Sequence, residues 1–209
     1  MSGRIIETEA CIAEGLAWLI RAEPRFSRAL EMTGPPPPRR RPDGFAALVE
    51  AIVSQQLSVA SADAIVRRMR AAGLVEEGAI ARADEAALCA CGLSGPKIRY
   101  LRALAAAGLD YHRLRTASDE EVIATLTEIT GIGRWTAEIY AMFSLGRVDV
   151  LAAGDLALQE AARLLFELPA RPEERRLRAM AAPWSPWRGV AARLLWAYYR
   201  VCKQREGIR

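Results

Sequence analysis

The most informative segment of the sequence is Leu126-Thr127-Glu128-Ile129-Thr130-Gly131-Ile132-Gly133-Arg134-Trp135-Thr136-Ala137. Apolar residues recur at helical spacing before and after it, so one helix ends and another begins within this stretch. Gly131 and Gly133 allow positive φ angles and a close approach of the backbone to a ligand. The stretch therefore predicts two helices joined by a tight turn.

The start of the second helix is a candidate anion site. The first N–H groups of a helix lack intrahelical acceptors and lie at the positive end of its dipole, so they suit a DNA phosphate. The residues expected at phosphates are Gly131, Gly133, Arg134 and Thr136. Backbone carbonyls of Thr127, Ile129 and Gly131 could in addition bind Na⁺ or K⁺. An ordinary turn between two helices would also explain the glycines.

The rest of the chain also favours helices. Apolar residues recur three and four positions apart, strand-rich segments are absent, and the N-terminal helix is expected over about residues 5–20. Four prolines, Pro35 to Pro38, then impose an extended loop. We predict an all-α fold with two helical lobes around a cleft. Residues 1–42 form a helical arm with a Pro-rich loop packing on the main body, which comprises residues 43–209.

Composition limits the class of protein. The chain has 29 Lys and Arg against 25 Asp and Glu, a net charge of +4, which is compatible with a polyanionic partner. The spacing of its four cysteines matches neither a zinc site nor an iron–sulfur cluster. No secretory signal core and no apolar stretch of membrane-spanning length is visible. We therefore expect a cytoplasmic protein without a membrane partner.

Further motifs accompany the hairpin. Gly154-Asp155-Leu156-Ala157-Leu158-Gln159 follows about twenty residues after Trp135. With it, the hairpin resembles the helix-hairpin-helix (HhH-GPD) superfamily of DNA glycosylases, which places its essential aspartate there. Ile52 to Ser58, Gly92 to Leu101 and Trp184 to Arg188 resemble the 3-methyladenine DNA glycosylase II branch, and the match covers roughly residues 44–199. The resemblance implies monofunctional release of alkylated purines from duplex DNA in base excision repair.

This resemblance assigns the chemistry to Asp155. Loss of a purine leaves positive charge on the sugar, and a carboxylate near the anomeric carbon stabilises that charge and positions water. Asp155 would also serve as a helix N-cap, and the two roles are compatible. The base must leave the duplex, and aromatic faces favour a cationic base. The pocket residues implied are Trp135, Tyr140 and Trp187, for which core packing is the alternative.

The resemblance also assigns DNA contacts outside the hairpin. The turn after Gly92 corresponds to a wedge that fills the space of the flipped base. The expected wedge and phosphate residues are Leu93, Ser94, Gly95 and Lys97, unless this is a plain helix–helix turn. The residues expected at the DNA backbone or the opposite strand are Gln55, Gln56 and Ser58. A buried polar interlock would explain the glutamines equally well.

Other functions remain open at this point. A non-catalytic helix-hairpin-helix DNA-binding protein would not need Asp155, and a helical scaffold would leave the clustered motifs unexplained. Lyases of the superfamily place a lysine where this chain has Trp135, and many carry a four-cysteine cluster. We expect no required cofactor, no iron–sulfur cluster and a monomer that acts on damaged duplex DNA. We expect it to act in the bacterial cytoplasm, on DNA of the nucleoid. A glycosylase of the same superfamily that removes another lesion is the alternative.

Overall fold

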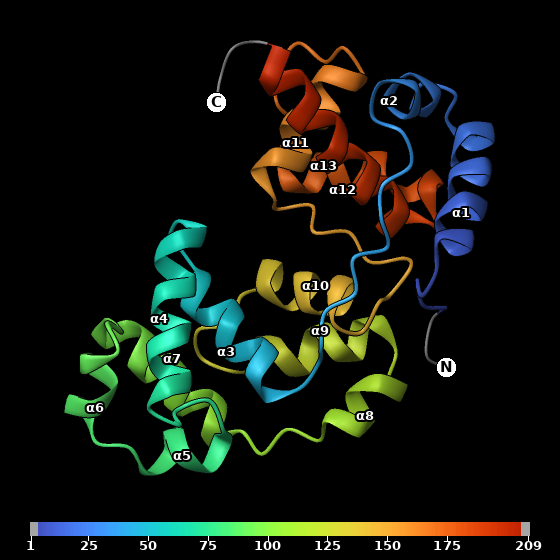
Figure 1. Cartoon of the computed structure of the whole chain (residues 1–209). Helices are drawn as coiled ribbons and strands as arrows, with labels where there is room; N and C mark the ends of the chain where they lie inside the picture. The colour runs from blue at the N-terminus through green and yellow to red at the C-terminus, as the bar shows by residue number, and fades with distance from the viewer. Residues whose placement is uncertain (1–3, 206–209) are drawn as a thin grey trace. The chain divides into compact units, whose positions relative to one another are not determined.

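The structure, a computed structural model, describes residues 4–205 and consists of helices joined by loops (Figure 1). Within that range no strand forms, and one isolated antiparallel bridge joins Ile5 to Arg147. The all-α prediction is confirmed. The described residues form two compact units: unit 1 comprises residues 41–145, and unit 2 comprises residues 4–40 together with 146–205.

Unit 1 contains the helices from α3 to α10. Their bounds are α3 Phe45–Ser54, α4 Val59–Ala71, α5 Glu77–Arg82, α6 Glu85–Ala90, α7 Gly95–Ala106, α8 Tyr111–Thr116, α9 Asp119–Thr127 and α10 Arg134–Phe143. Helix α3 packs against α4, α7 and α10, and α9 packs against α10. The apolar face of α3, with Leu48, Val49, Ile52 and Val53, is buried. This packing fixes the hairpin between α9 and α10 on the core of unit 1.

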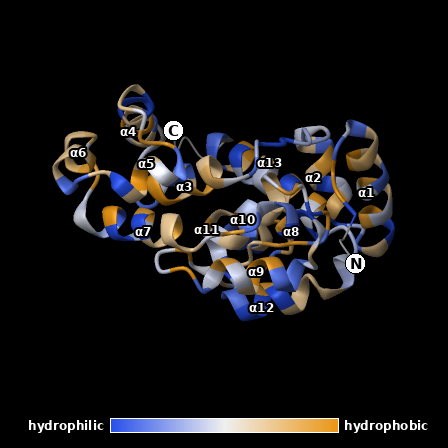
Figure 2. Ribbon diagram, turned by 90° about the horizontal axis from the view of Figure 1, so that it is seen from below, coloured by the Kyte–Doolittle hydropathy of each residue, from blue (hydrophilic) through white to orange (hydrophobic). Residues whose placement is uncertain are grey.

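The helix starts in unit 1 follow from local capping chemistry. Ser118 and Glu121 form a capping box at the start of α9, with bonds in both directions. Asp84 and Asp110 cap α6 and α8 by accepting from backbone N–H groups. The helices carry both hydrophobic and hydrophilic residues, as expected of amphipathic segments (Figure 2).

Unit 2 is built around the last helix. The bounds of its elements are α1 Glu9–Ala22, α2 Phe26–Thr33, α11 Leu156–Leu165, α12 Glu174–Met180, the 3₁₀ turn η1 Ala182–Trp184, and α13 Arg188–Arg205. Helix α13 packs against α1, α2 and α11. Phe26, Phe166 and Trp184 form an aromatic cluster with ring centroids 5.1–5.8 Å apart. The N-terminal segment thus shares a core with the C-terminal helices.

Two features of the N-terminal segment differ from expectation. The first helix begins at Glu9 instead of near residue 5, because the preceding residues pair with an extended segment: Ile6 N–H donates to the carbonyl of Gly146, and Val148 N–H to that of Arg4. Helix α2 was not predicted. The expected division at residue 42 lies close to the boundary between units, but residues 146–205 group with the N-terminal segment.

Among residues 4–205, no helix is long and apolar enough to cross a membrane.

Candidate functional site

The hairpin turn in unit 1 depends on Gly131. Its φ angle is +96°, and a Cβ atom at this position would lie 2.2 Å from Cγ of Tyr100 on α7. Both facts require glycine, since other residues are strained in this region and the ring leaves no space. Ile129 and Ile132 are buried on either side of the turn. The turn is therefore anchored in the core of unit 1.

Gly133 differs from the prediction, because its φ of −79° lies outside the positive region. It is the N-cap of α10, makes no side-chain cap, and a Cβ atom there would meet nothing within 4 Å. The fold of unit 1 therefore does not require glycine at this position. A glycine leaves the start of α10 open to an anion that approaches closely.

Gln55 ties the hairpin to the end of α3. Its side-chain Nε2 donates to the carbonyl of Gly131 at 2.9 Å and to Oγ1 of Thr136 at 3.3 Å, and Thr136 is buried. These bonds form the buried polar interlock that was the alternative to a DNA contact. Gln55 and the Thr136 side chain thus hold the hairpin in place.

The carbonyls proposed for a monovalent cation are partly engaged. The carbonyl of Ile129 accepts from the N–H of Ile132 at 2.9 Å, and that of Gly131 accepts from Gln55. A carbonyl oxygen has two lone pairs, so these bonds leave room for a cation. Among the described residues, no group of three or more His, Cys, Asp or Glu side chains is placed to hold a metal ion. The cation site stays a prediction.

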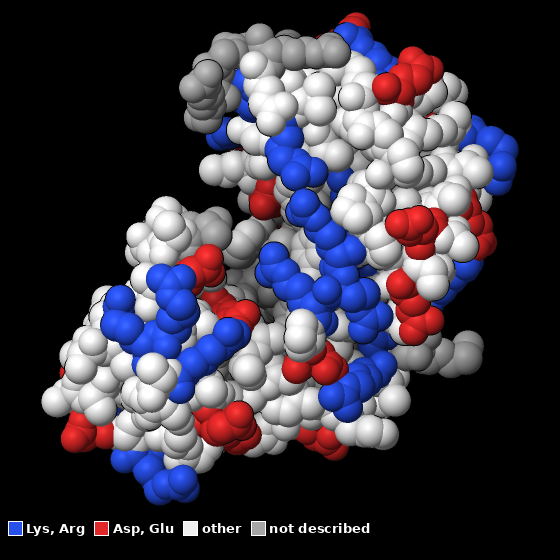
Figure 3. Space-filling model, in the orientation of Figure 1, with Lys and Arg blue, Asp and Glu red and all other residues white. Residues whose placement is uncertain are grey.

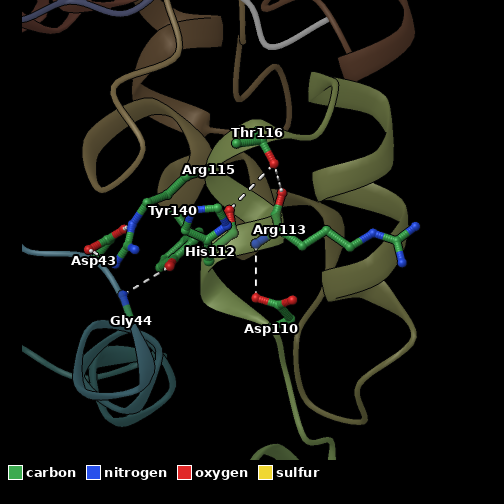
Figure 4. A network of polar contacts seen from close by, with 8 residues as sticks. All are labelled: Asp43, Gly44, Asp110, His112, Arg113, Arg115, Thr116 and Tyr140. Carbon is green, nitrogen blue, oxygen red and sulfur yellow. Dashed lines mark hydrogen bonds and ion pairs between the residues drawn. The ribbon is translucent and has the colours of Figure 1, made fainter.

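The side chains of α10 separate into exposed and buried groups. Trp135 is 42% exposed, and Arg134 pairs through Nε with Oε1 of Glu138 at 2.9 Å. Tyr140 is buried, and its hydroxyl accepts from the N–H of Gly44 at 3.0 Å (Figure 4). Burial raises the pKa of Tyr140 to about 12. Trp135 is thus exposed on this helix. Tyr140 packs in the core of unit 1, which favours the core alternative, and its pocket role stays a prediction.

The turn between α3 and α4 exposes an apolar residue that the sequence analysis did not single out. Leu57 is 40% exposed and follows Gln56, an exposed residue with a φ of +57°. Ser58 then caps α4 by accepting from the N–H of Ser61. The strained turn holds an aliphatic side chain in solvent, which fits a wedge that enters a DNA base stack.

The turn before α7 is arranged differently from the predicted wedge. Leu93 is 5% exposed and packs in the core of unit 1, whereas Ser94 and Gly95 are exposed. The ammonium group of Lys97 donates to the carbonyl of Val53, and burial lowers its pKa. Core packing thus holds Leu93, which favours the plain helix–helix turn, and the wedge role stays a prediction. Lys97 joins α7 to the end of α3.

Asp155 lies in unit 2 as the N-cap of α11. Its Oδ1 accepts from the N–H groups of Ala157 at 2.9 Å and Leu158 at 3.0 Å, and from Nε1 of Trp196 at 3.1 Å. These three donors hold Oδ1 of the carboxylate in place. Leu156, the first residue of α11, is exposed. The N-cap and the Trp196 bond together orient Asp155 before any ligand arrives.

The tryptophans of unit 2 differ from the predicted assignment. Trp187 is buried, its ring lies under the guanidinium of Arg4 at 4.6 Å, and a Cβ atom on Gly15 would lie 2.6 Å from its Cε3. It packs against α1, which favours the core alternative. Trp196, for which the sequence predicted no role, donates to the candidate carboxylate. The apolar sequence around Trp196 does not predict its hydrogen bond to Asp155.

Comparisons with known proteins find a matching family and similar chains. The family model described as HhH-GPD superfamily base excision DNA repair protein matches residues 49–186. DNA-3-methyladenine glycosylase 1 of Schizosaccharomyces pombe is 30% identical over 198 residues, which cover 88% of this chain and 86% of that protein.

Two solved structures are similar over most of the chain. The DNA-3-methyladenine glycosidase from Bacillus halodurans has a TM-score of 0.80 at 34% identity and covers 88% of each chain. The Schizosaccharomyces pombe 3-methyladenine DNA glycosylase in complex with abasic DNA has a TM-score of 0.78 at 31% identity, and covers 88% of this chain and 95% of that one.

The two hairpin glycines should respond differently to one and the same substitution. Gly131→Ser should reduce the free energy of unfolding by at least ~2 kcal/mol, because serine is strained at positive φ and meets Tyr100. Gly133→Ser should change it by less than ~0.5 kcal/mol, because serine is a good N-cap and has space. Urea unfolding of the two variants measures this difference. Equal stability of the two variants would contradict the account of the turn.

Proposed function

This chain belongs to the HhH-GPD superfamily of base excision DNA repair proteins, and on that premise we propose that it is a monofunctional DNA glycosylase. It flips alkylated purines of the 3-methyladenine type out of duplex DNA and hydrolyses their N-glycosidic bonds. The observation that carries the proposal is the Asp155 carboxylate, oriented by α11 and Trp196 at the position of the family's aspartate. Its relatives named as 3-methyladenine glycosylases support the substrate class.

The hairpin supplies a contact to the DNA backbone. The start of α10 has no side-chain cap, and Gly133 leaves it sterically open, so a phosphate binds to its N–H groups. Arg134 adds a cation beside this position, held at Nε by the buried Glu138. These contacts position the protein without reading the sequence of bases.

Flipping the base needs a side chain that replaces it in the stack. Leu57 is suited to this role, because it is aliphatic and exposed at a turn with strained backbone. The flipped base then binds against an aromatic face. Trp135 offers that face from α10, and a cationic alkylpurine gains cation–π attraction on it.

Asp155 acts on the sugar. The C–N glycosidic bond breaks with its electron pair leaving on the purine, and positive charge develops at the anomeric carbon. The carboxylate stabilises this charge and accepts a proton from the water that attacks the carbon. The products are a free base and an intact strand with an abasic site.

The distribution of amines favours water as the nucleophile. A lyase needs an amine beside the anomeric carbon, and the chain has two lysines, Lys97 and Lys203. Lys97 donates to the carbonyl of Val53, and Lys203 lies over the ring of Tyr199. Neither lies directly after the hairpin, where Trp135 occupies the position at which lyases of the superfamily place a lysine. We place the activity in the bacterial cytoplasm, on nucleoid DNA, as a monomer without a required cofactor.

The direct test of this function is base release from duplexes that each carry one lesion. 3-Methyladenine and 7-methylguanine should be released, and strands should stay intact until alkali cleaves the abasic site. Ethenoadenine and hypoxanthine in the same panel define the lesion range. Binding of damaged DNA without release of any base would favour the non-catalytic alternative.

Asp155→Asn should reduce the single-turnover rate of base release by at least about a hundredfold, while duplex affinity changes by less than about twofold. Asparagine still caps a helix, so the fold should be retained. The matched control is Asp110→Asn, at the N-cap of α8, which should release bases like the unchanged protein. A comparable rate for Asp155→Asn and Asp110→Asn would refute the assignment of the carboxylate.

Leu57→Ala should slow base release by about tenfold when the lesion is paired, because the wedge offsets the cost of unstacking. The effect should be smaller for the same lesion in a mismatch, since a mispaired base leaves the stack more easily. Single-turnover rates on the two duplexes measure the difference. An equal loss on both duplexes would argue that Leu57 acts after flipping.

A further inference from the structure

Unit 2 carries a cluster of arginines that the proposed chemistry does not use. Arg39 and Arg40 directly follow the four prolines, and Arg193 lies in α13. Figure 3 shows Lys and Arg side chains gathered along the path that residues 34–40 take in Figure 1. The prolines restrict the backbone of this segment, so they also limit the positions that the arginines after it can take.

Arg193 is a buried cation held by neutral acceptors. It is 3% exposed, its Nε donates to the carbonyl of Pro38 at 3.0 Å, and its Nη1 donates to that of Gly189 at 2.8 Å. Burial, together with the nearby charges of Arg40 and Arg39, lowers the pKa of Arg193 to about 10. The bond to Pro38 fastens the Pro-rich segment to α13. It also holds the charge of Arg193 close enough to Arg39 and Arg40 for the three charges to interact.

Arg40 lies against Gly146. A Cβ atom on Gly146 would lie 2.5 Å from Nη1 of Arg40, and Gly146 has a φ of +75°. The guanidinium therefore occupies space that only a glycine leaves open. Two separate features, the Pro38 carbonyl bond and the Gly146 gap, hold the segment and its arginines together.

Arg39 adopts a backbone conformation that arginine rarely takes. Its φ is +49°, in the left-handed region, and the residue is exposed. Within residues 4–205 no hydrogen bond or ion pair to Arg39 is seen to offset this strain. An unfavourable backbone angle that persists without such compensation is typical of functional positions.

We propose that the exposed Arg39 and Arg40 form a second phosphate-binding site, in unit 2, for the backbone of duplex DNA, and that the buried charge of Arg193 adds to its positive potential. Three guanidinium groups brought together repel one another, and an anion at the exposed side relieves that repulsion. Arginine suits phosphate, because its planar fork donates two parallel hydrogen bonds. The choice of duplex DNA as the source of the phosphate rests on the proposed function.

The test variant is Arg39→Asn, because asparagine tolerates the left-handed region and removes the charge while preserving the fold. The matched control is Arg176→Ala, which removes one exposed positive charge from α12 of the same unit. The equilibrium affinity of each protein for an undamaged duplex is measured between 50 and 200 mM salt. Single-stranded RNA of equal length serves as a second probe.

Loss of one phosphate contact lowers the slope of log affinity against log salt by about 0.9. The advantage of the unchanged protein over Arg39→Asn should therefore shrink about threefold to fourfold from 50 to 200 mM salt, whereas Arg176→Ala keeps the original slope. Three outcomes would overturn the site: an unchanged slope for Arg39→Asn, an equal fall for both variants, or a loss confined to single-stranded RNA.

The result is separable from the proposed function. A reduced slope for Arg39→Asn in a protein that releases no base would support the site and refute the glycosylase activity. Normal base release by the unchanged protein, with equal slopes for all variants, would refute the site alone.

Discussion

The close approach of Gly131 to Tyr100 is the constraint on which the hairpin depends. With a φ of +96° and no Cβ, this residue lets the turn lie against α7, and Gln55 then bonds to its carbonyl and to Thr136. The turn is thus fixed by α3 and α7 before α10 begins. A helix start that contacts DNA phosphates must not shift with the loop before it, and these contacts prevent such a shift.

Asp155 illustrates how one local interaction serves two purposes. As an N-cap it satisfies two backbone N–H groups of α11, and those same bonds orient its carboxylate. Trp196 adds a third donor from α13, the central helix of unit 2. Pre-orientation of this kind is what a group needs in order to stabilise charge that appears only as the glycosidic bond breaks. The proposed catalyst is therefore part of the scaffold as well as of the chemistry.

Sequence patterns were sufficient for the helices with clear caps and periodic apolar faces, such as α3 and α9, and for the N-cap position of Asp155. They did not predict α2, nor which aliphatic residue of a turn is exposed. Leu93 and Leu57 each stand beside polar residues, and only packing buries the first and exposes the second. Likewise Gly131 and Gly133 look alike in the sequence, whereas the φ angle and the neighbouring ring distinguish them.

Asp155 is proposed to stabilise positive charge on the sugar. The most direct measurement compares the affinity of the protein for two duplexes, one with a cationic azasugar and one with a neutral abasic analogue at the lesion position. The account predicts that the cationic analogue binds more tightly by on the order of a hundredfold, and that Asp155→Asn removes this preference without weakening binding of the neutral analogue. Equal affinity of the unchanged protein for both duplexes would contradict the claim.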